Sequence, residues 1–398
     1  MEDIGADSMW KGYCMNGRSI LTIFCMVAAM SSSWSSAAVP ATQFWVYIGT
    51  NSHPPSKSKG IYLCRFDSST GKTAEQALAA EIADPGWQVI APGGKFLYTV
   101  ATTSNHRTSI VAAYAIDPTT GALTALNQQP SKGRDTTHID VDPSGSCAVV
   151  ANYGSGDVSV LTINSDGTLA AVSAVIKHTG SSVNPDRQRH PFPHSCNFDP
   201  SGNFVLVPDL GLDKVYIYRF DAAIRALADA SPPTVAVAPG SGPRHLSFHP
   251  NGKFAYLINE MGGTVIAYAW DSSHGQLRPL QTVSTLPPGY HGTNTSAEVR
   301  IHPGGRFLYA SNRGPDDLAI FEINSAAGTL TPAGYQSTRG KAPRDFRIDP
   351  TGQFLFAANQ DSDSVVIFRI DAETGQLAPT GDVLAVPTPI CVTFLAVK

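Results

Sequence analysis

The chain has 398 residues, of which 42% are hydrophobic and only 15% are charged. It can therefore bury a large core, and this composition excludes an intrinsically disordered protein. The formal net charge is −4, and no run of Lys and Arg lies beside aromatic residues, so we expect no nucleic-acid partner.

The N-terminal segment is organised like a secretory leader. An apolar run from Ile20 to Met30 is too short to span a bilayer, and a stretch of small residues follows it, with Ser36 and Ala38 spaced as in an A-x-A-like cleavage site. We therefore expect residues 1–38 to be a signal peptide and residues 39–398 to be the folded domain. The mature protein is then secreted, with no membrane contact after leader removal.

The front of this segment departs from the leader pattern, because Glu2, Asp3 and Asp7 stand where positive charge is expected. A start of translation at Met9 or Met15 would remove these acids. The alternative interpretation is a disordered or membrane-anchored tail.

Two phrases recur along the rest of the chain at a period near fifty residues. The first phrase begins with an alternating apolar stretch, continues with a Pro-x-Gly turn that usually follows Asp or His, and ends with Phe-Leu-Tyr or a similar triplet. The prolines of its copies are Pro92, Pro143, Pro200, Pro250, Pro303 and Pro350. The second is an alternating strand that ends in Asp or Asn; its copies end at Asp67, Asp117, Asn164, Asp221, Asp271, Asn324 and Asp371. The second phrase therefore has one copy more than the first.

The missing copy is divided between the two ends of the chain. Trp45–Ile48 is similar to Phe254–Leu257, and Pro389–Phe394 is similar to Pro243–Phe248. Repeats of this length with β-branched and aromatic alternation indicate four-stranded blades. We predict an all-β, seven-bladed β-propeller whose ring is closed by N- and C-terminal strands that share one blade, which removes exposed sheet edges.

One repeat illustrates the blade. Its strands are expected at His245–Phe248, Phe254–Ile258, Thr264–Trp270 and Leu277–Ser284, with the first lining the central channel. The first two strands are antiparallel, so the start of the first and the end of the second lie on the same face.

Where the residue type differs from one copy of a repeat to the next, the position is either free of packing constraints or functional. Two sets of such positions meet at one mouth of the channel, where the long loops 177–193 and 284–297 also arrive. From their charged and polar members we select as candidates His194, Arg244, His245, Glu260, Glu298, Asn312, Arg313, Arg344 and Gln360.

Some of these side chains have a structural interpretation. The acids and arginines could form a ring of salt bridges that closes the channel, and Asn312 belongs to a set of four asparagines that we expect to cap strand ends. For Arg244, Arg313 and Arg344 we favour function, because three guanidinium groups at one mouth repel one another and require anions.

Histidines fall into two groups. His194 ends a long loop at the mouth and is suited to proton transfer near neutral pH, whereas His190 and His138 are weaker candidates. His249 and His302 replace Asp in the Pro-x-Gly turns and are expected to be structural.

Four cysteines lie in the body of the chain. They are far apart, they sit in apolar runs and they form no Cys-x-x-Cys pair, so we expect buried thiols rather than disulfides at Cys64, Cys147, Cys196 and Cys391.

Several longer phrases stand at these same positions: Pro193-His194-Ser195, Gly242-Pro243-Arg244-His245, Asn259-Glu260, Ala310-Ser311-Asn312-Arg313-Gly314 and Asn359-Gln360-Asp361-Ser362-Asp363. In this order they resemble the seven-bladed lactonase family, which holds bacterial 6-phosphogluconolactonases and fungal 3-carboxy-cis,cis-muconate cyclases. The resemblance runs from about Phe44 to the C-terminus. It departs from the family pattern at Gly86–Val89, which is expected to form one wall of the pocket and so to affect the choice of substrate.

The resemblance implies a catalytic set of His194, Arg244, Glu260 and Arg313. Opening a lactone requires activated water and stabilisation of the acyl oxygen, so His194 or Glu260 would move a proton while the arginines bind a carboxylate or phosphate. We expect substrate binding at Arg344, Glu298, His245, Asn312 and Gln360, and no metal or other cofactor. The expected activity is hydrolysis of a small anionic lactone by a monomer.

Three alternatives remain open. The first is a cycloisomerase of the muconate cyclase type, which forms a lactone with the same groups. The second is a calcium-dependent propeller lactonase, in which Asn152, Asn259, Asn312 and Glu260 would supply oxygen ligands. The third is a secreted propeller that binds without catalysis, because this fold also hosts such modules.

Overall fold

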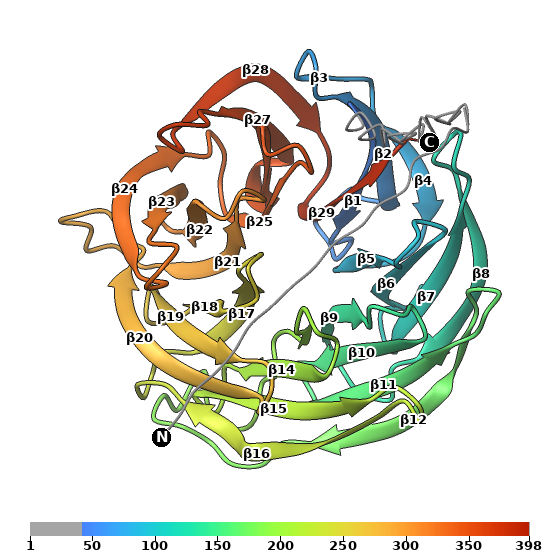
Figure 1. The fold of residues 1–398 in the computed structure, drawn as a ribbon. Coiled ribbons are helices and arrows are strands. Elements are labelled where there is room, and N and C mark those ends of the chain that lie inside the picture. The colour runs from blue at the N-terminus through green and yellow to red at the C-terminus, as the bar shows by residue number, and fades with distance from the viewer. Residues whose placement is uncertain (1–41, 398) are drawn as a thin grey trace, which may run out of the picture. The chain divides into compact units, whose positions relative to one another are not determined.

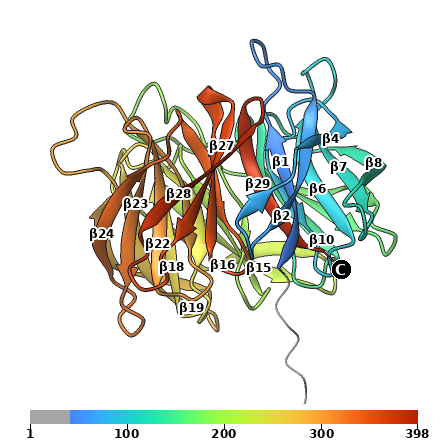
Figure 2. The same ribbon diagram turned by 90° about the horizontal axis from the view of Figure 1, so that it is seen from above.

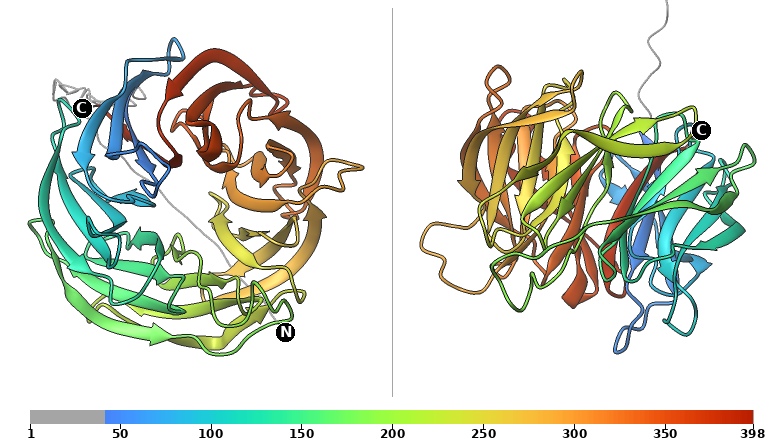
Figure 3. Two further views of the ribbon diagram at one scale, coloured as in Figure 1. Left: turned by 180° about the vertical axis from the view of Figure 1, so that it is seen from behind. Right: turned by 90° about the horizontal axis from the view of Figure 1, so that it is seen from below.

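The computed structural model describes residues 42–397, which form seven antiparallel sheets arranged as blades around a central channel (Figure 1). The strands run from one face of the ring to the other (Figure 2), and the blades surround the same axis when viewed from behind (Figure 3). The predicted seven-bladed propeller is therefore confirmed. Within residues 42–397, no helix is long and apolar enough to cross a membrane. The predicted leader, residues 1–38, lies outside the described residues.

Each blade is a four-stranded meander, and the first also carries a fifth short strand. From the channel outward, the first blade contains β29 (Pro389–Ala396), β1 (Gln43–Thr50), β2 (Gly60–Asp67) and β3 (Lys72–Thr73), with β4 (Ala77–Glu81) also paired to β2. The second contains β5 (Gln88–Ile90), β6 (Phe96–Thr102), β7 (Ser109–Ile116) and β8 (Leu123–Pro130), and the third contains β9 (Thr136–Val141), β10 (Cys147–Asn152), β11 (Asp157–Ile163) and β12 (Leu169–Lys177).

The other four blades follow in chain order. The fourth contains β13 (Asn197–Phe198), β14 (Phe204–Asp209), β15 (Lys214–Asp221) and β16 (Ala226–Ala236), and the fifth contains β17 (Pro243–Phe248), β18 (Phe254–Asn259), β19 (Thr264–Asp271) and β20 (Gln276–Ser284). The sixth contains β21 (Thr295–Ile301), β22 (Phe307–Arg313), β23 (Asp317–Ile323) and β24 (Leu330–Ser337). The seventh contains β25 (Pro343–Ile348), β26 (Phe354–Asn359), β27 (Ser364–Ile370) and β28 (Leu377–Ala385), with a short 3₁₀ helix, η1 (Gln360–Ser362).

The ring is closed where the two ends of the domain meet in the first blade. β29 pairs antiparallel with β1, so that Val46 stands opposite Phe394 and Ile48 stands opposite Val392. The predicted division of one repeat between the ends is confirmed. This pairing leaves no open edge at the junction between the first and last strands.

The tyrosine of the Phe-Leu-Tyr phrase joins neighbouring blades. Its hydroxyl donates a hydrogen bond of 2.8–3.0 Å to a glycine carbonyl in the turn between the third and fourth strands of the next blade. The four pairs are Tyr47 with Gly121, Tyr98 with Gly167, Tyr256 with Gly328, and Tyr309 with Gly375. The tyrosine belongs to the first recurring phrase, and the glycine stands shortly after the Asp or Asn that ends the second. The two phrases are therefore linked by one contact between neighbouring blades.

The histidines in the Pro-x-Gly turns make an equivalent contact. His249 Nε2 donates to the carbonyl of Gly305, and His302 Nε2 donates to that of Gly352, each at 2.8 Å in the next blade. Their predicted structural role is confirmed. The four cysteines of the body are also buried with free thiols, as expected.

The fourth blade differs from the repeat pattern near His194. Its innermost strand, β13, is only two residues long, and the chain before it makes a single isolated bridge between Pro193 and Asp209. Pro208 of β14 has no N–H to donate, so the regular ladder stops, and the N–H of His194 donates to the Pro208 carbonyl at 2.9 Å. His194 therefore stands in irregular backbone at the channel mouth rather than in a strand.

The contact between blades predicts a large cost for adding one methyl group at Gly328. This glycine has φ +73°, and a Cβ there would lie 2.3 Å from the Phe254 ring. Gly252 has nearly the same φ, +69°, but nothing within 4 Å of its Cβ position. We expect Gly252→Ala to lower the free energy of unfolding by about 1 kcal/mol and Gly328→Ala by about 2 kcal/mol more. If urea titrations showed that the two variants lose equal amounts of free energy of unfolding, this explanation would be contradicted.

Candidate functional site

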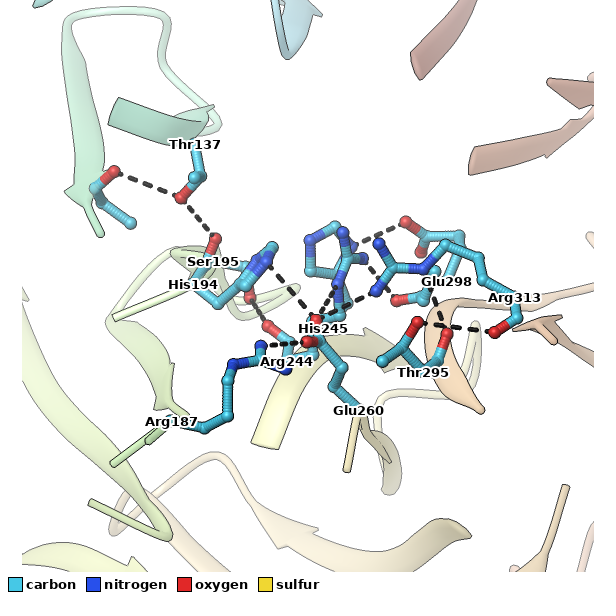
Figure 4. A network of polar contacts seen from close by, with 12 residues as sticks. Thr137, Arg187, His194, Ser195, Arg244, His245, Glu260, Thr295, Glu298 and Arg313 are labelled. Atoms are coloured by element: carbon cyan, nitrogen blue, oxygen red, sulfur yellow. Dashed lines mark hydrogen bonds and ion pairs between the residues drawn. The ribbon is translucent and has the colours of Figure 1, made fainter. Parts of the chain in front are cut away.

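Polar and charged side chains from three blades meet at one mouth of the channel. Arg244 belongs to β17, Glu260 follows β18, Arg313 ends β22, and His194 precedes β13 (Figure 4). Arg187 reaches the same place from the long loop before His194. The structure thus brings together the four residues that the sequence assigned to catalysis.

The carboxylate of Glu260 is the centre of this cluster. Its Oε2 lies 3.1 Å from Arg244 Nε and 3.1 Å from Arg313 Nη2, and its Oε1 lies 2.5 Å from Arg187 Nη2. One carboxylate therefore contacts three guanidinium groups. Sequence reasoning missed Arg187, because this residue lies in a loop outside the repeats, and the unusual length of that loop was the only signal.

Backbone carbonyls hold two of the arginines in place. Arg244 Nη1 donates to the carbonyl of Ala297 at 2.5 Å, and Arg313 Nε donates to that of Thr295 at 3.0 Å. Both acceptors lie in β21, which links the fifth and sixth blades at the site. These bonds use only part of each guanidinium, so other N–H groups stay available to a ligand.

The electrostatics of the cluster follow from burial and from the excess of positive charge. Burial raises the pKa of Glu260, but the charges of Arg313, Arg244 and Arg187 outweigh it and lower this pKa to about 2. Burial and the nearby Arg313 and Arg344 lower the pKa of Arg244 to about 9. Glu260 is thus ionised at any working pH, and the guanidinium groups remain in mutual repulsion.

His194 is nearly buried, with 5% of its surface exposed. Its Nε2 lies 4.0 Å from Glu260 Oε2, and its Nδ1 has no hydrogen-bond partner in the described structure. Burial and the charge of Arg244 hold the pKa of His194 well below its usual value near 6.5. The imidazole is therefore neutral at pH 7, the form that can accept a proton.

A cavity of about 180 Å³ opens beside this cluster. Three of the predicted residues, His194, Arg244 and Arg344, are on its wall, together with Trp87. Arg344 makes no hydrogen bond or carboxylate ion pair within residues 42–397. Burial and the positive charge of Arg313 lower the pKa of Arg344 to about 10. The cavity wall therefore carries a guanidinium group that makes no direct ion pair with a carboxylate of the described chain.

His245 and Glu298 form a separate buried pair below the cluster. His245 Nδ1 lies 2.7 Å from Glu298 Oε2, whose other oxygen is 3.2 Å from Arg300 Nε. The ring of His245 also packs edge-on against those of Trp87, at 4.9 Å, and His194, at 5.1 Å. Neither His245 nor Glu298 lines the cavity, so this pair supports the cavity wall from behind.

The remaining two residues assigned to substrate binding lie elsewhere. Asn312 accepts hydrogen bonds from Thr285 and Ser296 and donates to Asp317 at the end of β22. Gln360 begins η1 and donates to Asp361, outside the cavity. The contacts of Asn312 are those of a strand cap, the role expected for the set of four asparagines.

This arrangement combines three chemical capabilities in one small cavity. It can bind an anion through Arg244 and Arg344, it can transfer a proton through a neutral imidazole, and it can stabilise developing negative charge with cationic N–H donors. Acyl transfer at a carboxylic ester or lactone requires these same capabilities.

Comparisons with known proteins agree with this geometry. Residues 45–394 match the family model described as "Lactonase, 7-bladed beta-propeller". The chain is 35% identical over 354 residues to the 6-phosphogluconolactonase of Bacillus subtilis, which covers 89% of this chain and 99% of that protein. It is 36% identical over 290 residues to the 6-phosphogluconolactonase of Formosa agariphila. This match covers 72% of this chain and 81% of that protein.

A solved structure gives the same result. The periplasmic gluconolactonase of Pseudomonas aeruginosa superimposes with a TM-score of 0.84 at 34% identity, covering 89% of this chain and all of that one. The predicted family and the predicted lactone hydrolase are confirmed by these matches, and the cycloisomerase alternative is not needed to account for them. The chain belongs to the seven-bladed β-propeller lactonase family.

Proposed function

We propose that the protein hydrolyses a small anionic lactone in the cavity at the channel mouth, with no metal in the catalytic step. The observation that carries this proposal is the charge imbalance around Glu260, where Arg187, Arg244 and Arg313 share one carboxylate and Arg344 has none. A carboxylate or phosphate on the substrate would relieve the repulsion among these cations.

The acids on the cavity wall do not remove this imbalance. Asp84 and Asp135 line the cavity from the second and third blades, whereas Arg244, Arg313 and Arg344 belong to the fifth, sixth and seventh. An anionic substrate group is therefore attracted toward the arginine side, which orients the ring of the lactone in the cavity.

His194 is the proposed proton-transfer group. Its neutral imidazole takes a proton from water, and the water oxygen bonds to the lactone carbonyl carbon. The carbonyl oxygen becomes an oxyanion that guanidinium N–H groups stabilise. The bond between that carbon and the ring oxygen then breaks, and the departing oxygen takes the proton from His194, which yields the open hydroxy acid.

Glu260 has a positioning role in this scheme. With a pKa of about 2 and three arginine partners, it is a poor proton acceptor, but it fixes the guanidinium groups that would otherwise separate. Of the two candidates for the proton-transfer group, the geometry therefore favours His194.

The substrate class can be tested directly. The named relatives point to phosphorylated and unphosphorylated sugar lactones, so proton release should be followed with 6-phosphogluconolactone, gluconolactone and an uncharged aromatic lactone. We expect the phosphorylated compound to give the highest kcat/KM, because only this compound carries an anionic group that Arg344 and the arginines around Glu260 can bind.

Arg244 is expected to be required for turnover rather than for folding. Arg244→Lys keeps the charge but loses the two-pronged geometry, so kcat/KM should fall about tenfold or more; Arg244→Ala should cost about a hundredfold. Arg306→Ala, which removes an exposed guanidinium 3.3 Å from Glu322, is the matched control and should keep full activity. Lower melting temperatures with unchanged turnover in both Arg244 variants would show that this residue only closes the channel.

The pH profile tests His194. Because the pKa of His194 lies well below 6.5, the wild-type kcat should stay constant as pH falls through 6.5 and decline only at lower pH, where the imidazole gains its proton. His194→Gln should reduce kcat about a hundredfold or more and abolish this acid limb. A variant that keeps most of its activity, or the same acid limb, would place the base elsewhere.

We also propose export of the protein, which the leader-like segment and the periplasmic gluconolactonase of Pseudomonas aeruginosa support. Mass analysis of protein recovered from outside the cytoplasm should give an N-terminus near residue 39. A chain that starts at residue 39 should unfold at the same temperature as the exported protein. Exported material that still begins at Met1 would contradict the proposal.

A further inference from the structure

Two histidines and one aspartate gather at the cavity rim, away from the arginine cluster. His53 lies in the connection after β1, Asp84 in the connection before β5, and His106 in the connection after β6. Asp84 Oδ2 lies 2.6 Å from His106 Nδ1 and 3.1 Å from His53 Nε2, and the two rings are 4.6 Å apart. Within residues 42–397, this is the one group of three His, Cys, Asp or Glu side chains whose candidate ligand atoms all lie within 4.8 Å of one another.

The carboxylate of Asp84 is held firmly by the surrounding chain. Its Oδ1 accepts hydrogen bonds from the N–H of Ser52 at 2.8 Å and from the Ser52 hydroxyl at 3.0 Å, and its Oδ2 accepts one from the Thr102 hydroxyl at 2.8 Å. Such outer contacts orient the ligands of metal sites. They leave Oδ2 directed at the two histidines.

The backbone at this cluster is also unusual. Asp84 has φ +49° and His106 has φ +56°, a left-handed conformation that costs non-glycine residues free energy. Strain of this kind persists where the surrounding structure fixes it, and it is often found at binding sites. Here it places two ligands from different connections against each other.

The cluster shares its cavity with the proposed active site. His53 and Asp84 line the same 180 Å³ space as Arg244 and Arg344. Asp84 is one of the two acids on the cavity wall, and its side chain is only 11% exposed. A cation bound by His53 and Asp84 would therefore lie at the wall of the same cavity.

We propose that His53, Asp84 and His106 bind a first-row divalent metal ion such as Zn²⁺. Two imidazole nitrogens and one carboxylate oxygen are a ligand set that such ions prefer. Tetrahedral coordination at about 2.1 Å separates ligand atoms by roughly 3.4 Å, so side-chain shifts of about 1 Å from the present separations are sufficient. The fourth position is left for water.

Other histidine and carboxylate pairs in the described chain lack this arrangement. His178 is fully buried and uses both ring nitrogens, on Asp209 and on the Tyr218 hydroxyl. His274 pairs with Asp271 at 2.8 Å on the exposed surface, without a third ligand. The last pair provides a matched control for adventitious binding to surface histidines.

Metal binding can be measured without any substrate, so the result does not depend on the proposed function. Protein freed of metal by chelation should bind one equivalent of Zn²⁺ by titration calorimetry, and Co²⁺ should give the visible absorption of a tetrahedral site. His106→Ala and Asp84→Asn should each weaken Zn²⁺ binding at least tenfold, whereas His274→Ala should leave it unchanged.

His53→Ala guards against loss of fold, because the His53 side chain is 53% exposed and supports no core. This variant should keep the wild-type melting temperature while it loses the tetrahedral Co²⁺ spectrum. No Zn²⁺ binding at 100 µM metal, or equal binding in wild type and in the His53, Asp84 and His106 variants, would overturn the proposal. A protein that binds Zn²⁺ here but opens no lactone would leave this site intact and refute only the proposed function.

Discussion

The hydrogen bond from a tyrosine of one blade to a glycine carbonyl of the next is the contact on which the ring depends. It recurs at four of the junctions between blades, and the glycine leaves room for the aromatic ring beside it. At these four junctions the contact fixes how one blade is rotated from the next. Because the proposed active site takes one or two side chains from each of several blades, its distances depend on how the blades are placed and are set by no single blade.

At the mouth of that ring, Glu260 converts a set of repelling cations into an ordered binding surface. It contacts Arg187, Arg244 and Arg313, so one buried negative charge balances only part of the positive charge around it. A fully balanced cluster would be a structural salt bridge, and a cluster without Glu260 would lose its geometry. The partial balance keeps the arginines ordered and leaves excess positive charge, on which the proposed binding of an anion depends.

The repeats explain why so much of this could be predicted from the sequence. Periodic phrases revealed seven blades, and positions that broke the repeat revealed His194, Arg244, Glu260, Arg313 and Arg344. Residues outside the repeat register gave no comparable signal, so Arg187 was missed. The protonation states could not be read either, because the pKa values of His194 and Glu260 depend on burial and on charges from other blades.

The two sides of the cavity follow different rules. The arginines of one side occupy repeat positions and belong to the phrases that resemble the lactonase family. The other side carries Trp87, where the sequence departs from the family pattern, together with His53 and Asp84 from irregular connections. Trp87 stacks on His138 at 4.5 Å and contacts His245 at 4.9 Å, which anchors this wall to the pair behind the cluster. In the proposed reaction, the arginines that would bind the anion therefore come from the regular strands, and the opposite wall, with Trp87, would limit the shape of the lactone.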